Sequence, residues 1–307
     1  MQDVPQISGV VMQHFPATRS QNSPDVGAFY DKATGSWQYV ASDPATGQAA
    51  IIDPVLNFDP AAGATWTACA DEILSYVAEK GLEVAWVLDT HPHADHFSAA
   101  HYLAQKLGAR QGIGQRVLEV QRIWADLYAQ DDLQNRPDYW DRLFDDGDSI
   151  ALGELQVRVI LSTGHTLASV SYLVGDAVFA HDTLMMPESG SARADFPGGS
   201  TEELWHTIRT ILDLSVETRV FIGHDYGEAP ACMAAVAEHR ATNKHVKDGI
   251  TKSEFIETRE ARDATLGLPD RMLHALQVNL RGGRLPEADA QGRAVLRVPL
   301  NRFTPKG

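Results

Sequence analysis

Cysteine is scarce in this chain: Cys69 and Cys232 are the only two among 307 residues. Two cysteines cannot supply a disulfide scaffold, so we expect a reducing, cytoplasmic compartment. The chain also lacks any apolar run near the roughly 20 residues that a membrane-spanning helix needs. Its first residues lack the basic segment and apolar core of a signal peptide. We therefore do not expect the protein to have a membrane as a partner.

Positive charge is also in short supply. Lysine and arginine total 26 against 41 aspartate and glutamate residues, which gives a formal net charge of −15. Such a chain repels phosphate backbones, so we do not expect nucleic acid as a partner. The hydrophobic content of 44% and charged content of 22% are ordinary for a globular protein. The oligomeric state is left open, with a homo-oligomer as one option.

The length of the chain fits one α/β domain with an appended segment. We expect the main domain in residues 1–235 and a C-terminal extension in residues 236–307. The extension is predicted to be helical, to end in a tail rich in glycine and proline, and to pack on the main domain. It shows no clustering of polar residues.

Strand and helix patterns alternate along the main domain. Residues 37–41 and 49–52 are predicted to form a hairpin, because turn-forming residues lie between them. Residues 70–77 show helical spacing of apolar side chains, and Gly81 supplies a stop signal. Further strands are predicted at residues 84–88, 155–161, 169–174, 177–180 and 219–222, and further helices after the capping residues Ser98 and Ser200. This alternation predicts a mixed α/β sandwich.

Metal-ligating side chains cluster at the end of the apolar run 84–88. His91, His93, Asp95 and His96 stand within six residues. Such a set on a short loop after a buried strand is hard to explain structurally, whereas a rigidly held metal site requires it. Three more groups of the same kind follow other predicted strands: His165, Asp182 and His224. We therefore predict that the loops gather these seven residues around metal.

The motif Thr90 to His96 resembles the Thr-His-x-His-x-Asp-His motif of the metallo-β-lactamase superfamily, and residues 164–166, 181–183 and 223–225 resemble its later motifs. The resemblance covers roughly residues 25 to 230 and implies an αββα sandwich of two mixed sheets flanked by helices. In dinuclear members the pattern implies two ligand sets: His91, His93, His165 and Asp182 for one metal, and Asp95, His96, Asp182 and His224 for the other.

The chain is more similar still to one branch, the persulfide dioxygenases and the related bacterial β-lactamase-hydrolase-like proteins. Residues 190–199, 224–226 and 262–269, with Asn279, carry this resemblance. It implies one iron(II) per chain, held by two histidines and an aspartate: His91, His165 and Asp182. Such a face leaves positions open for a substrate sulfur and O2 together.

The expected reaction converts a low-molecular-weight thiol persulfide, with glutathione persulfide as the favoured substrate, and O2 to sulfite and the thiol. The remaining groups around the metal are expected to be catalytic, with His93 or His224 orienting water: His93, Asp95, His96 and His224. Because all four are present, a dinuclear hydrolase of glyoxalase II type with two zinc, iron or manganese ions stays the alternative. A third class is a regulatory partner that binds metal or a persulfide.

Substrate contacts are expected from Arg193, whose planar fork can grip a carboxylate, and from Tyr226, which follows His224. The alternative for Arg193 is an ion pair with Asp195. His181 stands where many relatives have glycine, either as a partner of the Asp182 carboxylate or as a tolerated variant. The cysteines are expected to be buried and inert, Cys232 in a helical context. Isolated histidines are expected to be structural: His14, His101, His206, His239, His245 and His274.

Overall fold

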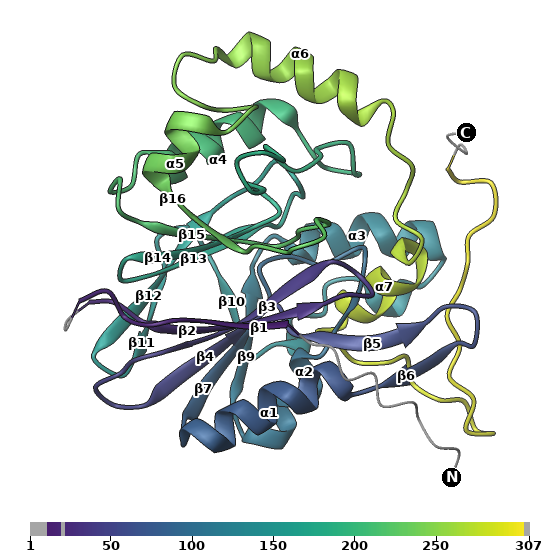
Figure 1. The fold of residues 1–307 in the computed structure, drawn as a ribbon. Coiled ribbons are helices and arrows are strands. Elements are labelled where there is room, and N and C mark those ends of the chain that lie inside the picture. Colours follow the sequence, from purple (N-terminus) through teal and green to yellow (C-terminus); the bar gives the residue numbers. More distant parts are fainter. Residues whose placement is uncertain (1–10, 20–21, 304–307) are drawn as a thin grey trace.

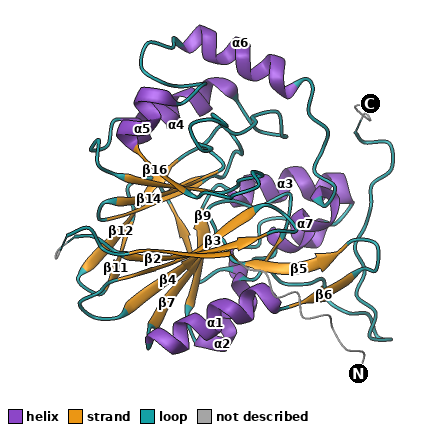
Figure 2. Ribbon diagram, in the orientation of Figure 1, coloured by secondary structure: helices purple, strands orange, loops and turns teal. Residues whose placement is uncertain are grey.

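The computed structural model describes residues 11–19 and 22–303. Within these residues, two large β-sheets lie face to face and helices cover the outer side of each (Figure 1; Figure 2). This layering confirms the predicted αββα sandwich. No helix of the described residues is long and apolar enough to cross a membrane.

The first sheet has seven strands in the order β1-β2-β3-β4-β7-β9-β10. Its first four strands pair antiparallel, whereas β4, β7, β9 and β10 run parallel. A central parallel strand is covered on both faces, which explains the nearly continuous apolar run of residues 84–88. The strands are β1 (Val11–Phe15), β2 (Asp25–Asp31), β3 (Ser36–Ser42), β4 (Gln48–Ile52), β7 (Glu83–Leu88), β9 (Arg110–Gly114) and β10 (Arg142–Phe144).

The second sheet has six strands in chain order, from β11 to β16. Only β14 and β15 pair parallel; the other neighbours are antiparallel. A two-residue turn joins β13 to β14 as predicted, with Gly175 at a φ of 57°. The strands are β11 (Ser149–Leu152), β12 (Leu155–Leu161), β13 (Val170–Val174), β14 (Ala177–His181), β15 (Arg219–Ile222) and β16 (Met233–Ala235).

A small third sheet holds β5 (Val55–Asp59) between β6 (Ala64–Trp66) and β8 (Phe97–Ser98). Two of the helix signals in the sequence, a stop and a start, are confirmed. Gly81 closes the first helix in the left-handed region at a φ of 63°, and the Ser200 hydroxyl accepts from the Glu203 N–H at 3.2 Å. The helices are α1 (Ala68–Lys80), α2 (Ala100–Leu107), α3 (Val117–Tyr128), α4 (Thr201–Leu212), α5 (Val236–Thr242), α6 (Lys252–Asp263) and α7 (Met272–Asn279).

Apolar side chains fill the space between the layers. Between the two sheets, the rings of Tyr39, Phe179 and Phe221 contact one another with centroids 5.1 to 5.4 Å apart. Such aromatic pairs add about 0.5–1.5 kcal/mol each beyond their area burial. Helices α1 and α2 pack on the outer face of the first sheet, and α4 with α5 and α6 packs on that of the second. The core between the sheets thus holds the two sheets together, and the outer cores hold the helices on them.

Two local predictions need correction. Ser98 does not begin α2 as its cap; it ends β8, although its hydroxyl still accepts from the Ala100 N–H at 3.1 Å. Cys232 is not in a helix. It directly precedes the edge strand β16 and packs in the core between the two sheets.

The residues of the C-terminal extension share the cores of the main domain. Phe255 of α6 packs with α4, and Val278 of α7 packs with α1 and α2. The shared cores support the proposal that the extension packs on the main domain. The domain boundary at residue 235 remains a proposal.

Candidate metal centre

Strand direction brings the metal-ligating loops together. Strands β12, β14 and β15 run in the same direction, because β13 is antiparallel to both of its neighbours and β15 is parallel to β14. Their carboxyl ends therefore meet at one edge of the second sheet, where His165, Asp182 and His224 follow them. The loop after β7 supplies His91 from the facing sheet.

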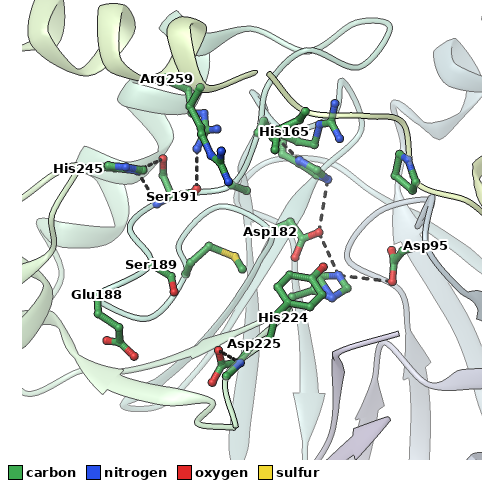
Figure 3. A pocket seen from close by; sticks show the side chains of 18 of the residues that line it. Asp95, His165, Asp182, Glu188, Ser189, Ser191, His224, Asp225, His245 and Arg259 are labelled. Atoms are coloured by element: carbon green, nitrogen blue, oxygen red, sulfur yellow. Dashed lines mark hydrogen bonds and ion pairs between the residues drawn. The ribbon is translucent and has the colours of Figure 1, made fainter. Parts of the chain in front are cut away.

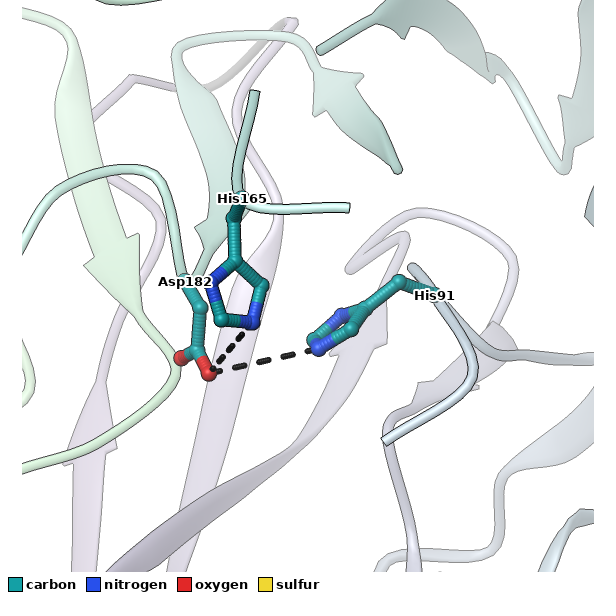
Figure 4. Close-up of side chains that lie close together, drawn as sticks. All are labelled: His91, His165 and Asp182. Carbon is teal, nitrogen blue, oxygen red and sulfur yellow. Dashed lines mark ion pairs between the residues drawn. The ribbon is translucent and has the colours of Figure 1, made fainter. Parts of the chain in front are cut away.

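Three of the predicted ligands form a compact group (Figure 4). The Asp182 Oδ2 atom lies 3.9 Å from His91 Nε2 and 3.5 Å from His165 Nε2. Two ligand atoms that each lie about 2.1 Å from one ion can be at most about 4.2 Å apart. Both distances fit a shared metal, and all three residues are buried.

Hydrogen bonds fix which ring nitrogen faces Asp182. The Thr90 hydroxyl donates to Asp53 Oδ2 at 2.7 Å, so its oxygen is left to accept from His91 Nδ1 at 3.0 Å. The Arg193 carbonyl accepts from His165 Nδ1 at 2.8 Å. Both histidines therefore carry their proton on Nδ1 and present the Nε2 lone pair, the arrangement that a metal ligand requires.

The donor atoms themselves indicate metal. Among the described residues, His91 Nε2 and Asp182 Oδ1 are buried without a hydrogen-bond partner, which is costly unless a cation satisfies them. Burial, with the neighbouring His93, holds the pKa of His91 well below its ordinary value. Burial also lowers the pKa of His165. Both imidazoles are therefore neutral and available as ligands.

His224 joins this group to a second one. Its Nε2 lies 3.2 Å from Asp182 Oδ2 and 3.6 Å from Asp95 Oδ2. The same Asp95 oxygen accepts from the Ser36 hydroxyl at 3.0 Å and lies 2.9 Å from His96 Nδ1. Burial raises the pKa of Asp95, but the His96 and His224 imidazoles outweigh it and hold the pKa well below its ordinary value.

His93 is held by an ion pair with Asp53. Its Nε2 lies 2.9 Å from Asp53 Oδ1, a residue with the unusual φ of 50°. Despite burial, Asp53 raises the pKa of His93 to about 9, and His93 lowers the pKa of Asp53. Its other nitrogen, Nδ1, has no hydrogen-bond partner among the described residues. His93 groups with Asp95 and His96 rather than with the His91, His165 and Asp182 set.

Glycines of the motifs make room for these side chains. A Cβ atom at Gly223 would lie 2.2 Å from Asp182 Oδ1, so this position must be glycine for the carboxylate to keep its place. Gly164 has a φ of 128°, and a Cβ there would lie 2.3 Å from the Leu204 backbone of α4. The glycines of these two motifs thus serve close packing.

His181 does not contact the Asp182 carboxylate. Its Nε2 bonds to the hydroxyls of Ser162 at 2.8 Å and Thr183 at 3.0 Å. Its backbone has a φ of 42°, a region that favours glycine. Of the two readings, the tolerated variant fits the structure better, with the hydroxyl bonds holding the ring in place.

A cleft of about 1080 Å3 opens beside the metal ligands (Figure 3). Asp95, His165, Asp182 and His224 line one end of it. The C-terminal extension supplies part of the lining through Lys244, His245, Arg259, Arg262 and residues 266–269. Polar residues that are not clustered in the sequence of the extension therefore converge here in the structure.

Both predicted substrate contacts line the cleft, but only one is available. Arg193 donates hydrogen bonds from Nε and Nη2 to the Asp195 carboxylate at 2.6 and 2.9 Å. Its Nη1 donates to the Gly267 carbonyl at 2.7 Å. The alternative of an ion pair with Asp195 is what the structure shows, and the fork is already occupied. Tyr226 is 71% exposed, and its ring lies parallel to that of His224 with centroids 5.9 Å apart.

Several residues that support the site were not predicted from their local sequence. Asp53 holds the Thr90 N–H at 2.7 Å in addition to His93. Asn279 donates to the carbonyls of both His93 and His96, at 2.7 and 2.8 Å. No periodicity marks such residues; a buried asparagine at the end of an apolar helix is the one local signal for Asn279.

Comparisons with known proteins agree with this geometry. Residues 33–224 match the family model described as the metallo-beta-lactamase superfamily. The chain is 55% identical over 281 residues to a beta-lactamase hydrolase-like protein of Agrobacterium fabrum; this match covers 91% of the chain but only 65% of that longer relative. It is 40% identical to Glyoxylase B2 of Dictyostelium discoideum, which covers 91% of this chain and 98% of that one.

Similarity to persulfide dioxygenases is more distant. The chain is 26% identical to the human mitochondrial persulfide dioxygenase ETHE1, over 83% of this chain and 87% of that protein. The crystal structure of ETHE1 from Myxococcus xanthus superposes with a TM-score of 0.68 at 28% identity, covering 89% of this chain and all of that one.

The cysteines provide a first test of the site. Burial, with Asp31 nearby, raises the pKa of Cys69 to about 12, and burial raises the pKa of Cys232. Neither thiol ionises at neutral pH, so Cys69→Ser and Cys232→Ser should keep steady-state turnover within about tenfold of the parent. A loss beyond about a hundredfold in a folded variant would indicate a cysteine intermediate instead.

A second test concerns Gly223. We expect Gly223→Ala to displace the Asp182 carboxylate and to weaken metal binding by about 10–100-fold or more, the range for disturbed ligand support. Elemental analysis of the purified protein measures this. Gly227→Ala is the matched control on the same loop, because its Cβ would meet nothing closer than 3.5 Å. Equal metal content in the two variants would refute the packing argument.

Proposed function

Because the chain belongs to the metallo-β-lactamase superfamily, we propose that it is an iron(II)-dependent dioxygenase of low-molecular-weight thiol persulfides, glutathione persulfide in particular. In the proposed reaction a persulfide, O2 and water give the thiol, sulfite and two protons; the outer sulfur loses four electrons and O2 gains them. The observation that carries this proposal is the buried group of His91, His165 and Asp182. Two imidazoles and one carboxylate on one side of a metal are typical of iron(II) oxygenases.

The chain's own residues have distinct tasks in this proposal. His91, His165 and Asp182 hold the metal, and Thr90 and the Arg193 carbonyl hold the two rings in the ligating orientation. Bound iron(II) supplies the redox chemistry and the open positions for sulfur and O2. His224 lines the cleft beside Asp182 and is placed to orient water at its Nε2.

A dinuclear hydrolase of glyoxalase II type is the second candidate. His96 Nε2 is buried without a hydrogen-bond partner among the described residues, as expected of a ligand to further metal. Among the same residues His93 Nδ1 is buried without a partner too, but Asp53, despite burial, raises the pKa of His93 and favours its charged form, which has no lone pair for a metal. The similarity to Glyoxylase B2 favours the same candidate. Against it, no group of metal-ligating atoms within 4.8 Å of one another joins Asp182 to Asp95 or His96 in the described part of the chain.

Metal content and activity of ligand variants test the proposed reaction. His91→Ala, His165→Ala and Asp182→Ala should each lose iron and persulfide-dependent O2 consumption together, because three ligands leave no redundancy. His206→Ala, which removes an exposed histidine of α4, should keep both. Full iron content in any of the three ligand variants would refute the ligand set.

Asp95→Ala separates the two candidates in the same assay. The proposed dioxygenase should keep about one iron per chain in this variant while its turnover falls. A parent protein that purifies with two zinc ions, and an Asp95→Ala variant that retains one, would establish the hydrolase instead.

Charges along the cleft support a thiol carrier that bears carboxylates. Acidic side chains line this cleft: Asp95, Asp182, Glu188, Asp225 and Glu228. Lys244 and Arg262 are exposed and line the same cleft, where they are the cations not already paired with a carboxylate among the described residues. We therefore transfer the proposed carboxylate contact from Arg193 to these two residues. Tyr226 remains a proposed substrate contact because its exposed ring lies next to His224.

Kinetics of the cleft cations check this assignment. Arg262→Ala should raise KM for glutathione persulfide about fivefold with little change in kcat, the loss of about 1 kcal/mol of binding shared by ground and transition states. Lys244→Ala should behave alike, because its ammonium faces the same solvent-filled space. Arg122→Ala removes an exposed arginine of α3 outside the cleft and should leave KM unchanged. Equal KM values in all three variants would show that neither Lys244 nor Arg262 contacts the substrate.

A further inference from the structure

The segment of residues 190–194 carries the carbonyl that orients His165. This carbonyl belongs to Arg193 and accepts from His165 Nδ1 at 2.8 Å. Its place therefore determines where the ligating Nε2 atom points. On one side, the segment is tied to the loop of Asp182, since the Met185 N–H donates to the Gly190 carbonyl at 3.1 Å. The segment is thus hydrogen-bonded both to His165 and to the loop that carries Asp182.

The other side of the segment is held by the C-terminal extension. Arg259 Nη1 donates to the Ser191 carbonyl at 3.0 Å, and Asp263 Oδ2 accepts from the Ala194 N–H at 2.9 Å. The Arg193 carbonyl lies between these two attachment points. Helix α6 therefore holds the main chain at two points: the Ser191 carbonyl, two residues before the Arg193 carbonyl, and the Ala194 N–H, which belongs to the same peptide group as that carbonyl. Figure 3 shows Arg259 reaching the backbone at Ser191.

Two residues before α6 add to this attachment. Asn243 Nδ2 donates to the Gly190 carbonyl at 2.9 Å, and His245 Nδ1 accepts from the Ser191 N–H at 3.1 Å. Burial, with Arg259, lowers the pKa of His245 to about 4, so its ring is neutral and can accept. His245 also fills the space over Gly190, where a Cβ would lie 2.3 Å from the ring.

The two α6 residues form a buried ion pair. Arg259 Nη2 lies 2.7 Å from Asp263 Oδ1, and their side chains are only 4% and 5% exposed. A buried pair gains little net stability over apolar residues of similar size, because both charges lose their hydration. Such a pair can serve to fix geometry instead, and both partners bond to the main chain around Arg193.

We propose that Arg259 and Asp263 are positioning residues for the metal centre: α6 clamps residues 191–194 and thereby holds the Arg193 carbonyl against His165. This proposal rests on His165 being a metal ligand, but not on the reaction that the metal performs. It gives the C-terminal extension a direct part in the site, through the main chain rather than through contact with metal or substrate.

The test compares variants of two similar ion pairs. Asp263→Ala removes both the ion pair and the acceptor for Ala194. Asp263→Asn removes the charge but keeps an oxygen that can accept from the Ala194 N–H. Asp176→Ala is the matched control, because Asp176 and Arg219 also form a largely buried pair at 2.7 Å, at the opposite ends of β14 and β15 from the metal ligands.

Two measurements are made on each purified metal-loaded protein: the rate at which excess EDTA removes the metal, and the midpoint of thermal unfolding. We expect Asp263→Ala to release metal about tenfold faster, near the lower end of the effect of a lost ligand support. Asp263→Asn should release it within about twofold of the parent rate, since the backbone hydrogen bond survives. Asp176→Ala should lower the unfolding midpoint without changing metal release.

Unchanged release from Asp263→Ala, or equal acceleration in Asp176→Ala, would overturn the proposal. Arg259→Lys keeps the assay decisive if Asp263→Ala does not fold: an ammonium lacks the rigid fork through which Arg259 reaches the Ser191 carbonyl with Nη1 and Asp263 with Nη2, so release should again accelerate. A parent rate in this variant would overturn the clamp as well. Persulfide oxidation is not measured, so an error in the proposed reaction leaves these outcomes unaffected.

Discussion

The carboxylate of Asp182 is the point on which the rest of the site depends. Its Oδ2 atom lies within 3.2 to 3.9 Å of nitrogens from three histidines, which arrive on three different loops. The backbone is distorted to place it there. The pairing of β14 with β15 shifts register between Phe179 and His181, and His181 takes a positive φ. A bulge of this kind re-aims the side chain that follows, and here it turns Asp182 toward the facing sheet. Gly223 on the neighbouring loop completes the arrangement by leaving the oxygen room.

The sequence predicts this centre well because the signals are local. Apolar runs define the strands, the polar groups follow them directly, and parallel strands must end at the same edge. The supports of the centre could not be predicted in this way. Asp53 and Asn279 are separated from the residues that they hold by 37 and 186 positions. No spacing rule reaches so far, and a single buried aspartate or asparagine has no pattern of its own. The case of Arg193 is different. The sequence offered an ion pair with Asp195, two positions along the chain, as the alternative to a substrate contact, and this pair occupies the fork. The main-chain carbonyl of Arg193, which contacts His165, has no signal in the sequence.

Net charge and local charge lead to different expectations for binding. A chain of charge −15 repels anions at long range, yet the cleft beside the metal ligands contains Lys244, Arg259 and Arg262 among acidic side chains such as Glu188 and Glu228. Within a Debye length of about 8 Å at physiological salt, nearby charges outweigh distant ones. Arg259 is already neutralised by Asp263, whereas the exposed Lys244 and Arg262 face solvent in the cleft. A carboxylate of a small carrier can therefore be attracted locally by Lys244 and Arg262, in spite of the net negative charge of the chain.

The extension after residue 235 changes how the chain should be divided. By sequence it is an appendage, since it carries none of the metal-ligating motifs. In the structure, Asn279 of α7 holds the loop of His93 and His96, and Asp263 of α6 holds the segment that orients His165. The family model ends at residue 224, before both of these helices begin. Loops that carry ligands have few contacts of their own, and a metal tolerates little error in ligand position. The motif residues therefore supply the donor atoms, while part of the rigidity that makes them a site comes from helices outside the matched region. The proposed boundary at residue 235 therefore separates the motifs from side chains that hydrogen-bond to their loops.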